Sequence, residues 1–181
     1  MNHSITTLDG TTFDVLNPTP EMIVPETLAT VLGRTCRFGG HCKPFYTVAQ
    51  HSVLVCSLVP KELRLEALLH DAHEAYSGFG DVCSPVKLID KQVASILRKI
   101  EDGIDRVVAL RFGADVENFK HPEIVHADNV LLATEIRDLM PPVESWIVMS
   151  DPLPNTLEVW DIAKSVRVFL STLYRYSNRN I

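Results

Sequence analysis

Prolines and glycines divide this sequence into segments of helical length. Proline is well tolerated in the first turn of a helix, where its missing amide hydrogen is not needed. Between the breaks, apolar residues recur at the three- and four-residue spacing that places them on one face of a helix. We therefore expect helices that begin at Pro25, span 47–59, begin at Pro60 and carry the stretch LLHDAHEAY, span about 86–112, run from Pro122 to the Pro141-Pro142 pair, and span about 157–176. On the helix over about 86–112, the expected core side consists of Leu88, Ile89, Val93, Ile96, Leu97, Ile100 and Ile104.

The first 25 residues have a different pattern. The stretch TTFDVLNPTPEMIVP combines β-branched residues with Asn-Pro and Thr-Pro turn signals, which is compatible with a short N-terminal strand pair. The remaining segments are helical in pattern, so the expected fold class is all-α, a helical bundle. A length of 181 residues is typical of one domain, which we expect to span 1–181.

Composition excludes some classes of function. The formal net charge of -6 at pH 7 argues against broad nucleic-acid binding, although a local pocket can still bind a small anion. No apolar run reaches about 18 residues, so no contact with a membrane is expected. The beginning of the chain, MNHSITTLDG, lacks the basic-then-apolar pattern of a signal peptide. The four cysteines form no CxxC pair, which favours reduced thiols and a cytoplasmic location.

Ionisable residues interrupt the apolar faces of three expected helices. His51 has Val48 before it and Val55 after it at helical spacing, and His70-Asp71 follows two leucines. Asp128 has Leu131 and Leu132 at the same spacing. Buried ionisable groups are costly unless they are paired or bound to a metal. In a bundle these four side chains can meet, and their mixed nitrogen and oxygen donors suit divalent Zn, Mn, Co or Fe.

Each of these residues also has a structural interpretation. A single buried histidine is usually a core residue whose ring nitrogens are satisfied, and this applies to His51. Asp128 by itself could be a hydrogen-bond acceptor within the core. The adjacent pair His70-Asp71 is harder to explain in this way, and the conjunction over three helices favours a metal site.

The sequence resembles the HD superfamily of metal-dependent phosphohydrolases in the order His51, His70-Asp71 and Asp128. Fuller strings over about residues 12–140 are similar to the small HD hydrolases of bacteria and phages that act on 2′-deoxynucleotides. These strings are CRFGGH at 36–41, FYTVAQHSVLV at 45–55, LLHDAHEAY at 68–76, SPVK at 84–87 and HADNVLLATEIRDL at 126–139.

The resemblance implies an HD-domain bundle with one divalent metal ion at its centre. Its ligands would be His51, His70, Asp71 and Asp128, and Zn, Co or Mn is expected, with Mg also compatible. The metal would hold a phosphate oxygen and lower the pKa of a water molecule. Glu74, in the family pattern HD-x-x-E, would be the general acid or base. The alternative for Glu74 is a solvated helix residue.

The resemblance also implies substrate contacts. Arg37 would bind phosphate and Phe38 would stack on a base or sugar, the alternatives being a surface salt bridge and a core residue. Lys87 would be a further phosphate contact, and Asp81 would contact the deoxyribose. Relatives commonly have two fewer residues before this aspartate. The longer loop here adds Phe79, which could form a wall against the base, while the roles of His41 and His73 stay open.

Close relatives in this family carry out two reactions. One releases phosphate from deoxynucleoside monophosphates, and the other releases triphosphate from a deoxynucleoside triphosphate. Phages with 2-aminoadenine genomes use the second reaction to remove dATP. We expect a triphosphohydrolase that prefers dATP, with a 5′-deoxynucleotidase as the alternative, acting in the bacterial cytoplasm or in that of a phage host.

Two other classes remain open. The chain could be a catalytically silent protein that senses a nucleotide, or a helical oligomerisation module with buried polar pairs. A homo-oligomer, dimer or hexamer, is expected by analogy. The aromatic C-terminal helix could provide either interface or core, through Trp160, Phe169, Tyr174 and Tyr176.

Overall fold

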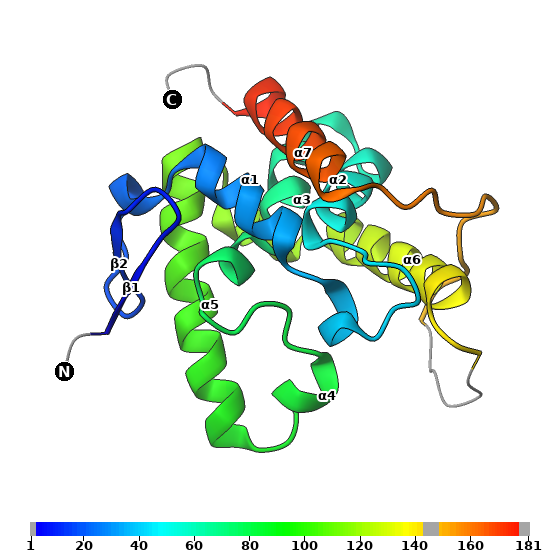
Figure 1. The fold of residues 1–181 in the computed structure, drawn as a ribbon, viewed down its shortest axis with the longest axis horizontal. Helices are drawn as coiled ribbons and strands as arrows, with labels where there is room; N and C mark the ends of the chain where they lie inside the picture. The colour runs from blue at the N-terminus through cyan, green and yellow to red at the C-terminus, as the bar shows by residue number, and fades with distance from the viewer. Residues whose placement is uncertain (1–2, 143–148, 178–181) are drawn as a thin grey trace.

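The computed structural model describes residues 3–142 and 149–177 and is mostly helical, with one small sheet (Figure 1). The expected all-α class is therefore confirmed at the level of secondary structure. The two ends of the expected domain, residues 1–2 and 178–181, lie outside the described residues. Within the described part of the chain, none of the helices combines the length and the apolar character needed to cross a membrane.

The expected N-terminal strand pair is also confirmed. Strands β1 (Ser4–Thr6) and β2 (Thr12–Asp14) are antiparallel, with Ile5 opposite Phe13. The helices that follow are α1 (Pro25–Arg34), α2 (Val48–Leu58), α3 (Arg64–Leu69), α4 (Ser84–Lys87), α5 (Lys91–Phe112), α6 (Pro122–Leu139) and α7 (Ile162–Tyr176). Short 3-10 turns connect them at η1 (Pro20–Met22), η2 (Arg37–Gly40), η3 (Lys61–Leu63), η4 (Ala72–Ala75) and η5 (Val116–Lys120).

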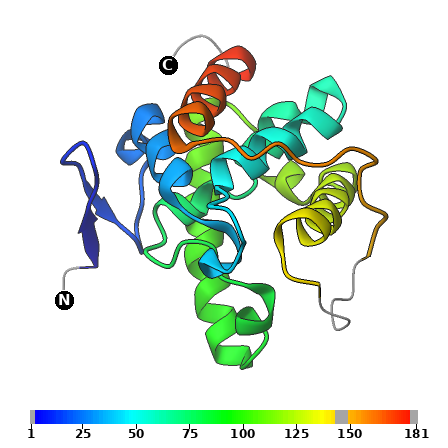
Figure 2. The ribbon, with the colours of Figure 1, turned by 45° about the vertical axis from the view of Figure 1, so that its right-hand side comes forward.

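Helix α2 is the central element of the bundle. It packs against α1, α3, α6 and α7, and Figures 1 and 2 show it surrounded by them. Its first turn is capped by Thr47, whose hydroxyl accepts a hydrogen bond from the Gln50 amide at 3.0 Å. On α7, Phe169 and Leu173 are fully buried in the shared core. A side chain near the start of α2 therefore points into the middle of the molecule.

Gln50 ties α2 to the segment that precedes α7. Its side-chain amide donates to the carbonyl of Glu158 at 2.7 Å, and its carbonyl accepts from the backbone amide of Trp160 at 2.9 Å. Both polar ends of this buried side chain are thereby satisfied. The clamp fixes the part of α2 that carries His51.

The expectation that one helix carries the whole stretch LLHDAHEAY is wrong. Helix α3 ends at Leu69, Asp71 has φ −107° and ψ 15°, and the chain continues as the 3-10 turn η4. This turn packs against α1 and α5, and the ring of Tyr76 stacks on Phe13 at 4.7 Å between centroids. Tertiary packing thus overrides the helix propensity of the sequence here.

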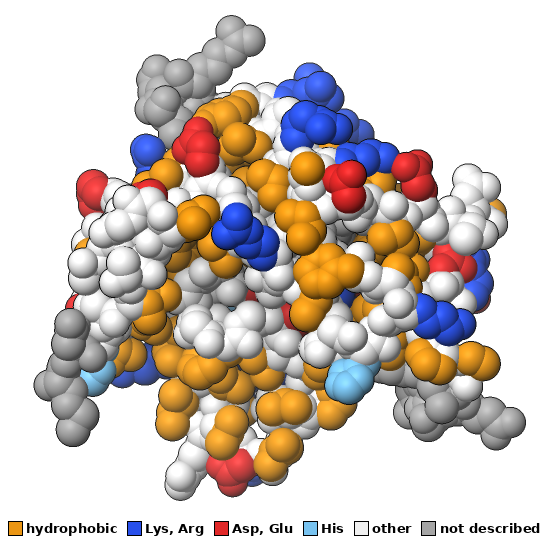
Figure 3. Space-filling view, in the orientation of Figure 1, with side chains coloured by type: hydrophobic (Ala, Val, Ile, Leu, Met, Phe, Trp, Pro, Cys, Tyr) orange, Lys and Arg blue, Asp and Glu red, His pale blue; other side chains and the backbone are white. Residues whose placement is uncertain are grey.

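The expected helix over about 86–112 is divided in two. Helix α5 begins after Asp90, whose side chain accepts hydrogen bonds from the amides of Gln92 and Val93 at 2.7 and 3.3 Å. Leu97, Ile100 and Ile104 are buried as expected. Four other residues expected on the core side are instead exposed: Leu88, Ile89, Val93 and Ile96. The lower part of the face in Figure 3, over α4 and the start of α5, is correspondingly rich in apolar side chains.

The last helix begins later than the expected residue 157. Asp161 caps α7, since its carboxylate accepts a hydrogen bond from the amide of Lys164 at 2.6 Å. The preceding segment, 151–160, is not helical and forms hydrogen bonds with side chains of α2 and α6. Leu157 lies in that segment and is partly buried against the core.

The close contact between α1 and α7 gives a stability prediction. A methyl group added at Gly33 would collide with Cγ2 of Val166, whereas one added at Gly103 in α5 would meet no atom within 4 Å. We expect Gly33→Ala to lower the free energy of unfolding by about 1–3 kcal/mol through overpacking. Gly103→Ala should raise it by roughly 0.5–1 kcal/mol, because alanine favours helix more than glycine does. Urea denaturation of both variants measures this, and equal shifts of one sign would contradict it.

Candidate metal centre

His51 lies fully buried on α2 with one ring nitrogen committed to a carboxylate. Its Nδ1 is 2.7 Å from Oε1 of Glu135, which is itself fully buried on α6. An ionised carboxylate can only accept, so Nδ1 donates the hydrogen and the lone pair of the neutral ring lies on Nε2. Nε2 is buried and has no hydrogen-bond partner among the described residues. Such a carboxylate partner is the usual support of a metal-ligating histidine.

His70 is held in the same way by the backbone. Its Nδ1 lies 2.8 Å from the carbonyl oxygen of Ala67, so this nitrogen is again the donor. Its Nε2 is buried without a hydrogen-bond partner and lies 3.3 Å from Oδ2 of Asp71. The end of helix α3 therefore places a nitrogen lone pair and a carboxylate oxygen of adjacent residues side by side.

Asp71 stands between the two imidazole rings. Its Oδ2 is 3.6 Å from Nε2 of His51, and the ring centroids of His51 and His70 are 5.5 Å apart. One ligand atom from each of these three residues lies within 4.8 Å of the others. Since both nitrogens carry lone pairs and Asp71 is an acceptor, a cation or proton is needed among them. The described residues thus include a group that could bind a metal ion.

Asp128 on α6 is the fourth predicted ligand. Its Oδ1 lies 3.2 Å from Nε2 of His51, although without the geometry of a hydrogen bond. Its side chain is 38% exposed, so it is the most accessible of the four predicted ligands and lies at the edge of the cluster. The structure places Asp128 beside His51 but outside the compact group formed by His51, His70 and Asp71.

Charges within the cluster shift its pKa values strongly. Burial alone would raise the pKa of Asp71, but His70, His51 and Arg37 outweigh it and hold that pKa well below its ordinary value. Burial and Arg37 would lower the pKa of His51, but Glu135 and Asp128 outweigh them and raise it to about 10. The carboxylates around His51 therefore favour a positive charge among the ligand atoms of the cluster. A divalent cation bound there would supply that charge.

Arg37 and Glu135 form a buried ion pair behind the cluster. Nη2 of Arg37 lies 3.1 Å from Oε2 of Glu135, and Nη1 lies 3.6 Å from Oδ2 of Asp71. Burial would raise the pKa of Glu135, but Arg37 and His51 outweigh it and lower that pKa. The structure thus places Arg37 against the metal cluster, supporting two of its carboxylates. Glu135 was not predicted, although it follows Asp128 by two helical turns and so shares its face of α6.

Glu74 lies beside the cluster on η4 and is buried. Its Oε2 has no hydrogen-bond partner among the described residues. Burial, reinforced by the charges of Asp71 and Asp81, raises the pKa of Glu74 well above its ordinary value. This shift favours the protonated form of the Glu74 carboxyl group.

The loop that holds Arg37 has an unusual backbone conformation. Phe38 has φ 55°, in the left-handed region that non-glycine residues seldom adopt. The carboxylate of Asp81 accepts a hydrogen bond from the Phe38 amide at 3.0 Å, which fixes this turn. The structure therefore brings Arg37, Phe38 and Asp81 together, with Asp81 binding the loop backbone.

Phe79 and Lys87 lie farther out. Phe79 is 51% exposed, and Nζ of Lys87 lies 2.9 Å from Oε1 of Glu101 on α5. Figure 3 shows a hollow near the middle of this face, with small areas of acidic side chain at its floor. Phe79 is free to contact a ligand, while Lys87 would have to exchange Glu101 for one.

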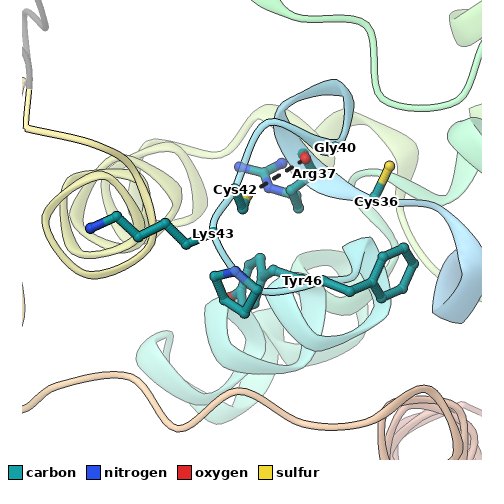
Figure 4. A pocket seen from close by; sticks show the side chains of 8 residues that line it. Cys36, Arg37, Gly40, Cys42, Lys43 and Tyr46 are labelled. Carbon is teal, nitrogen blue, oxygen red and sulfur yellow. Dashed lines mark hydrogen bonds between the residues drawn. The ribbon is translucent and has the colours of Figure 1, made fainter.

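A separate pocket lies beside Arg37. It has a volume of about 240 Å³ and is lined by Cys36, Arg37, Gly40, Cys42, Lys43, Pro44, Phe45 and Tyr46. In Figure 4 the thiol of Cys42 donates to the carbonyl of Arg37, and Lys43 points away from Arg37. His51, His70 and Asp71 do not line this pocket, so it is distinct from the metal cluster.

Comparisons with known proteins give relatives without an assigned activity. The chain is 39% identical over 117 residues to the uncharacterized protein YfdR of Escherichia coli, covering 65% of this chain and 61% of that protein. It is 36% identical over 115 residues to the uncharacterized protein RCAP_rcc00048 of Rhodobacter capsulatus, covering 59% and 56%. The chain thus spans about three fifths of the length of these relatives. No family model matches it.

Proposed function

We propose that this chain is an HD-type metal-dependent phosphohydrolase that converts a deoxynucleoside triphosphate, preferably dATP, and water to the deoxynucleoside and triphosphate. One observation carries the proposal. His51 and His70 each donate from Nδ1 to a fixed acceptor, and each directs an unpartnered Nε2 towards the carboxylate of Asp71. This donor set fits one divalent ion such as Zn, Co or Mn. Such an ion would polarise the phosphate and lower the pKa of a water molecule.

The chain's own groups support the same reaction. Water adds its oxygen to the α-phosphorus, the bond from phosphorus to O5′ breaks, and O5′ must receive a proton. Glu74 is buried beside Asp71, and its raised pKa favours the protonated form, which suits it to donate that proton. Arg37 supports Asp71 and Glu135 and thereby keeps the ligand arrangement in place.

The choice of substrate comes from the resemblance of the sequence blocks. The 5′-deoxynucleotidase breaks the same bond in a monophosphate, so the metal cluster does not distinguish the two reactions. Phe79 is exposed and Lys87 is partly exposed, so additional phosphates or a base could contact them. We also propose, by the same resemblance, that the enzyme acts as a homo-oligomer.

Product analysis tests the proposed reaction. The purified protein is incubated with Mn²⁺ and each of the four deoxynucleotides, as monophosphate and as triphosphate. Release of intact triphosphate from dATP is the expected result. Release of phosphate from monophosphates alone would establish the deoxynucleotidase instead. Metal binding without turnover of any deoxynucleotide would leave the nucleotide-sensing alternative.

The role of Glu74 gives a separate prediction. Glu74→Gln keeps the size of the side chain but cannot donate a carboxyl proton, so we expect turnover to fall by about 10²–10⁴-fold. One metal ion per chain should still bind, because His51, His70, Asp71 and Asp128 are unchanged. The matched control is Glu62→Gln, at an exposed position on η3. Steady-state rates and metal analysis measure both effects, and a near-normal rate would remove Glu74 from the proton transfer.

A further inference from the structure

A second group of potential ligands adjoins the first. One ligand atom from each of Asp71, His73 and Glu74 lies within 4.8 Å of the others, on the side of Asp71 where η4 begins. His73 and Glu74 are both buried. We propose that this group binds a second divalent cation, with Asp71 shared between the two sites.

His73 is oriented as a ligand. Its Nδ1 lies 3.0 Å from Oδ1 of Asp105 on α5, so the carboxylate accepts the hydrogen and Nε2 carries the lone pair. Oε1 of Glu101 lies 3.9 Å from Nε2, which is too far for a hydrogen bond. Nε2 of His73 is thus available to a metal, with Asp105 as its supporting carboxylate.

Glu74 provides an independent indication of a ligand. The side chain is only 6% exposed, and its Oε2 is buried with no hydrogen-bond partner among the described residues. A buried polar atom without a partner costs on the order of 1–3 kcal/mol, so such atoms in folded proteins usually serve a bound group. A cation bound by Glu74, Asp71 and His73 would satisfy it.

Arg37 and Lys87 do not provide the positive charge that the second group of ligands lacks. Arg37 is shared between Glu135 at 3.1 Å and Asp71 at 3.6 Å, and Lys87 pairs with Glu101 at 2.9 Å. Each of these cations therefore has a carboxylate partner outside the second group. Two carboxylates and one imidazole nitrogen suit Mn²⁺, Zn²⁺ or Co²⁺.

Occupation of the second site has a consequence for catalysis, which rests on the proposed function. A carboxylate bound to a metal cannot carry the proton that Glu74 is proposed to donate. The first ion therefore supports hydrolysis and the second opposes it. Excess metal should inhibit the enzyme.

Equilibrium dialysis and electron paramagnetic resonance with Mn²⁺ test the second site. The wild-type protein should bind two Mn²⁺ per chain and give the broadened spectrum of a coupled pair, because Asp71 bridges the ions. His73→Gln should bind one ion and give the spectrum of isolated Mn²⁺. The matched control, His41→Gln, changes an exposed histidine and should keep two.

The outcomes separate this inference from the proposed function. One ion in the wild type, or two in His73→Gln, would overturn the second site and leave the proposed function standing. No bound ion in the wild type would overturn both. In activity assays, excess Mn²⁺ should lower the wild-type rate several-fold relative to one equivalent and should not lower the rate of His73→Gln. Equal inhibition of both proteins would refute the competition at Glu74.

Discussion

Asp71→Asn is expected to abolish turnover and metal binding while the protein stays folded. The carboxylate of Asp71 lies 3.3 Å from Nε2 of His70 and 3.6 Å from Nε2 of His51, so it completes the compact donor group. An amide of the same size is a poor ligand for a divalent ion. In the proposed reaction, loss of the metal would remove the activation of water, and we expect the rate to fall by on the order of 10³-fold or more.

The fold should survive this substitution because Arg37 keeps its shorter contact with Glu135, at 3.1 Å. Circular dichroism, metal analysis and the deoxynucleotide assay measure the three properties separately. Asp151→Asn, at an exposed position, is the matched control and should change none of them. A variant at Asp71 that still binds metal with wild-type affinity would show that the cluster is not the metal centre.

Glu135→Ala should cause the largest loss of stability among substitutions in the site. Glu135 is fully buried and pairs with both Arg37 and His51. Its removal leaves buried Arg37 with only the longer contact to Asp71, at 3.6 Å, and leaves Nδ1 of His51 without its acceptor. We expect the free energy of unfolding to fall by about 3–5 kcal/mol. Glu123→Ala, on an exposed part of the same helix, should cost less than about 1 kcal/mol.

Glu135→Gln separates the two functions of this residue. The amide oxygen can still accept from Nδ1 of His51, but it lacks the charge that balances Arg37. The stability loss should be smaller than in the alanine variant, while metal affinity should fall by roughly 10–100-fold. Denaturant titrations and competition with a chelating dye measure these values, and unchanged metal affinity would exclude Glu135 as the support of His51.

Helical periodicity in the sequence correctly predicts the helices that carry two residues of the candidate site. His51 and Asp128 lie on α2 and α6 as their apolar neighbours predicted, and their side chains meet at 3.2 Å. Helical periodicity could not predict the ion pair between Arg37 and Glu135. The two residues are 98 positions apart, and Arg37 lies in an irregular turn whose backbone conformation has no periodic signature.

The break at the end of α3 was equally hidden. The stretch LLHDAHEAY contains neither glycine nor proline, so local propensity predicts an uninterrupted helix. The break depends on the packing of η4 against α1 and α5 and on the contact between Tyr76 and Phe13. The expectation that Leu88 and Ile89 belong to the core is wrong, because both lie between α4 and α5 and are exposed.

His51 and His70 of the candidate metal centre differ in the group that accepts the hydrogen bond from Nδ1. His51 depends on the side chain of Glu135, whereas His70 depends on a main-chain carbonyl, that of Ala67. A point mutation at Glu135 can therefore alter the electron-donating strength of the His51 imidazole. The His70 imidazole is not affected in this way, because a substitution at Ala67 keeps the backbone carbonyl. Selection or engineering could adjust the preference for a particular ion through position 135, without disturbing the geometry that the end of α3 imposes on His70.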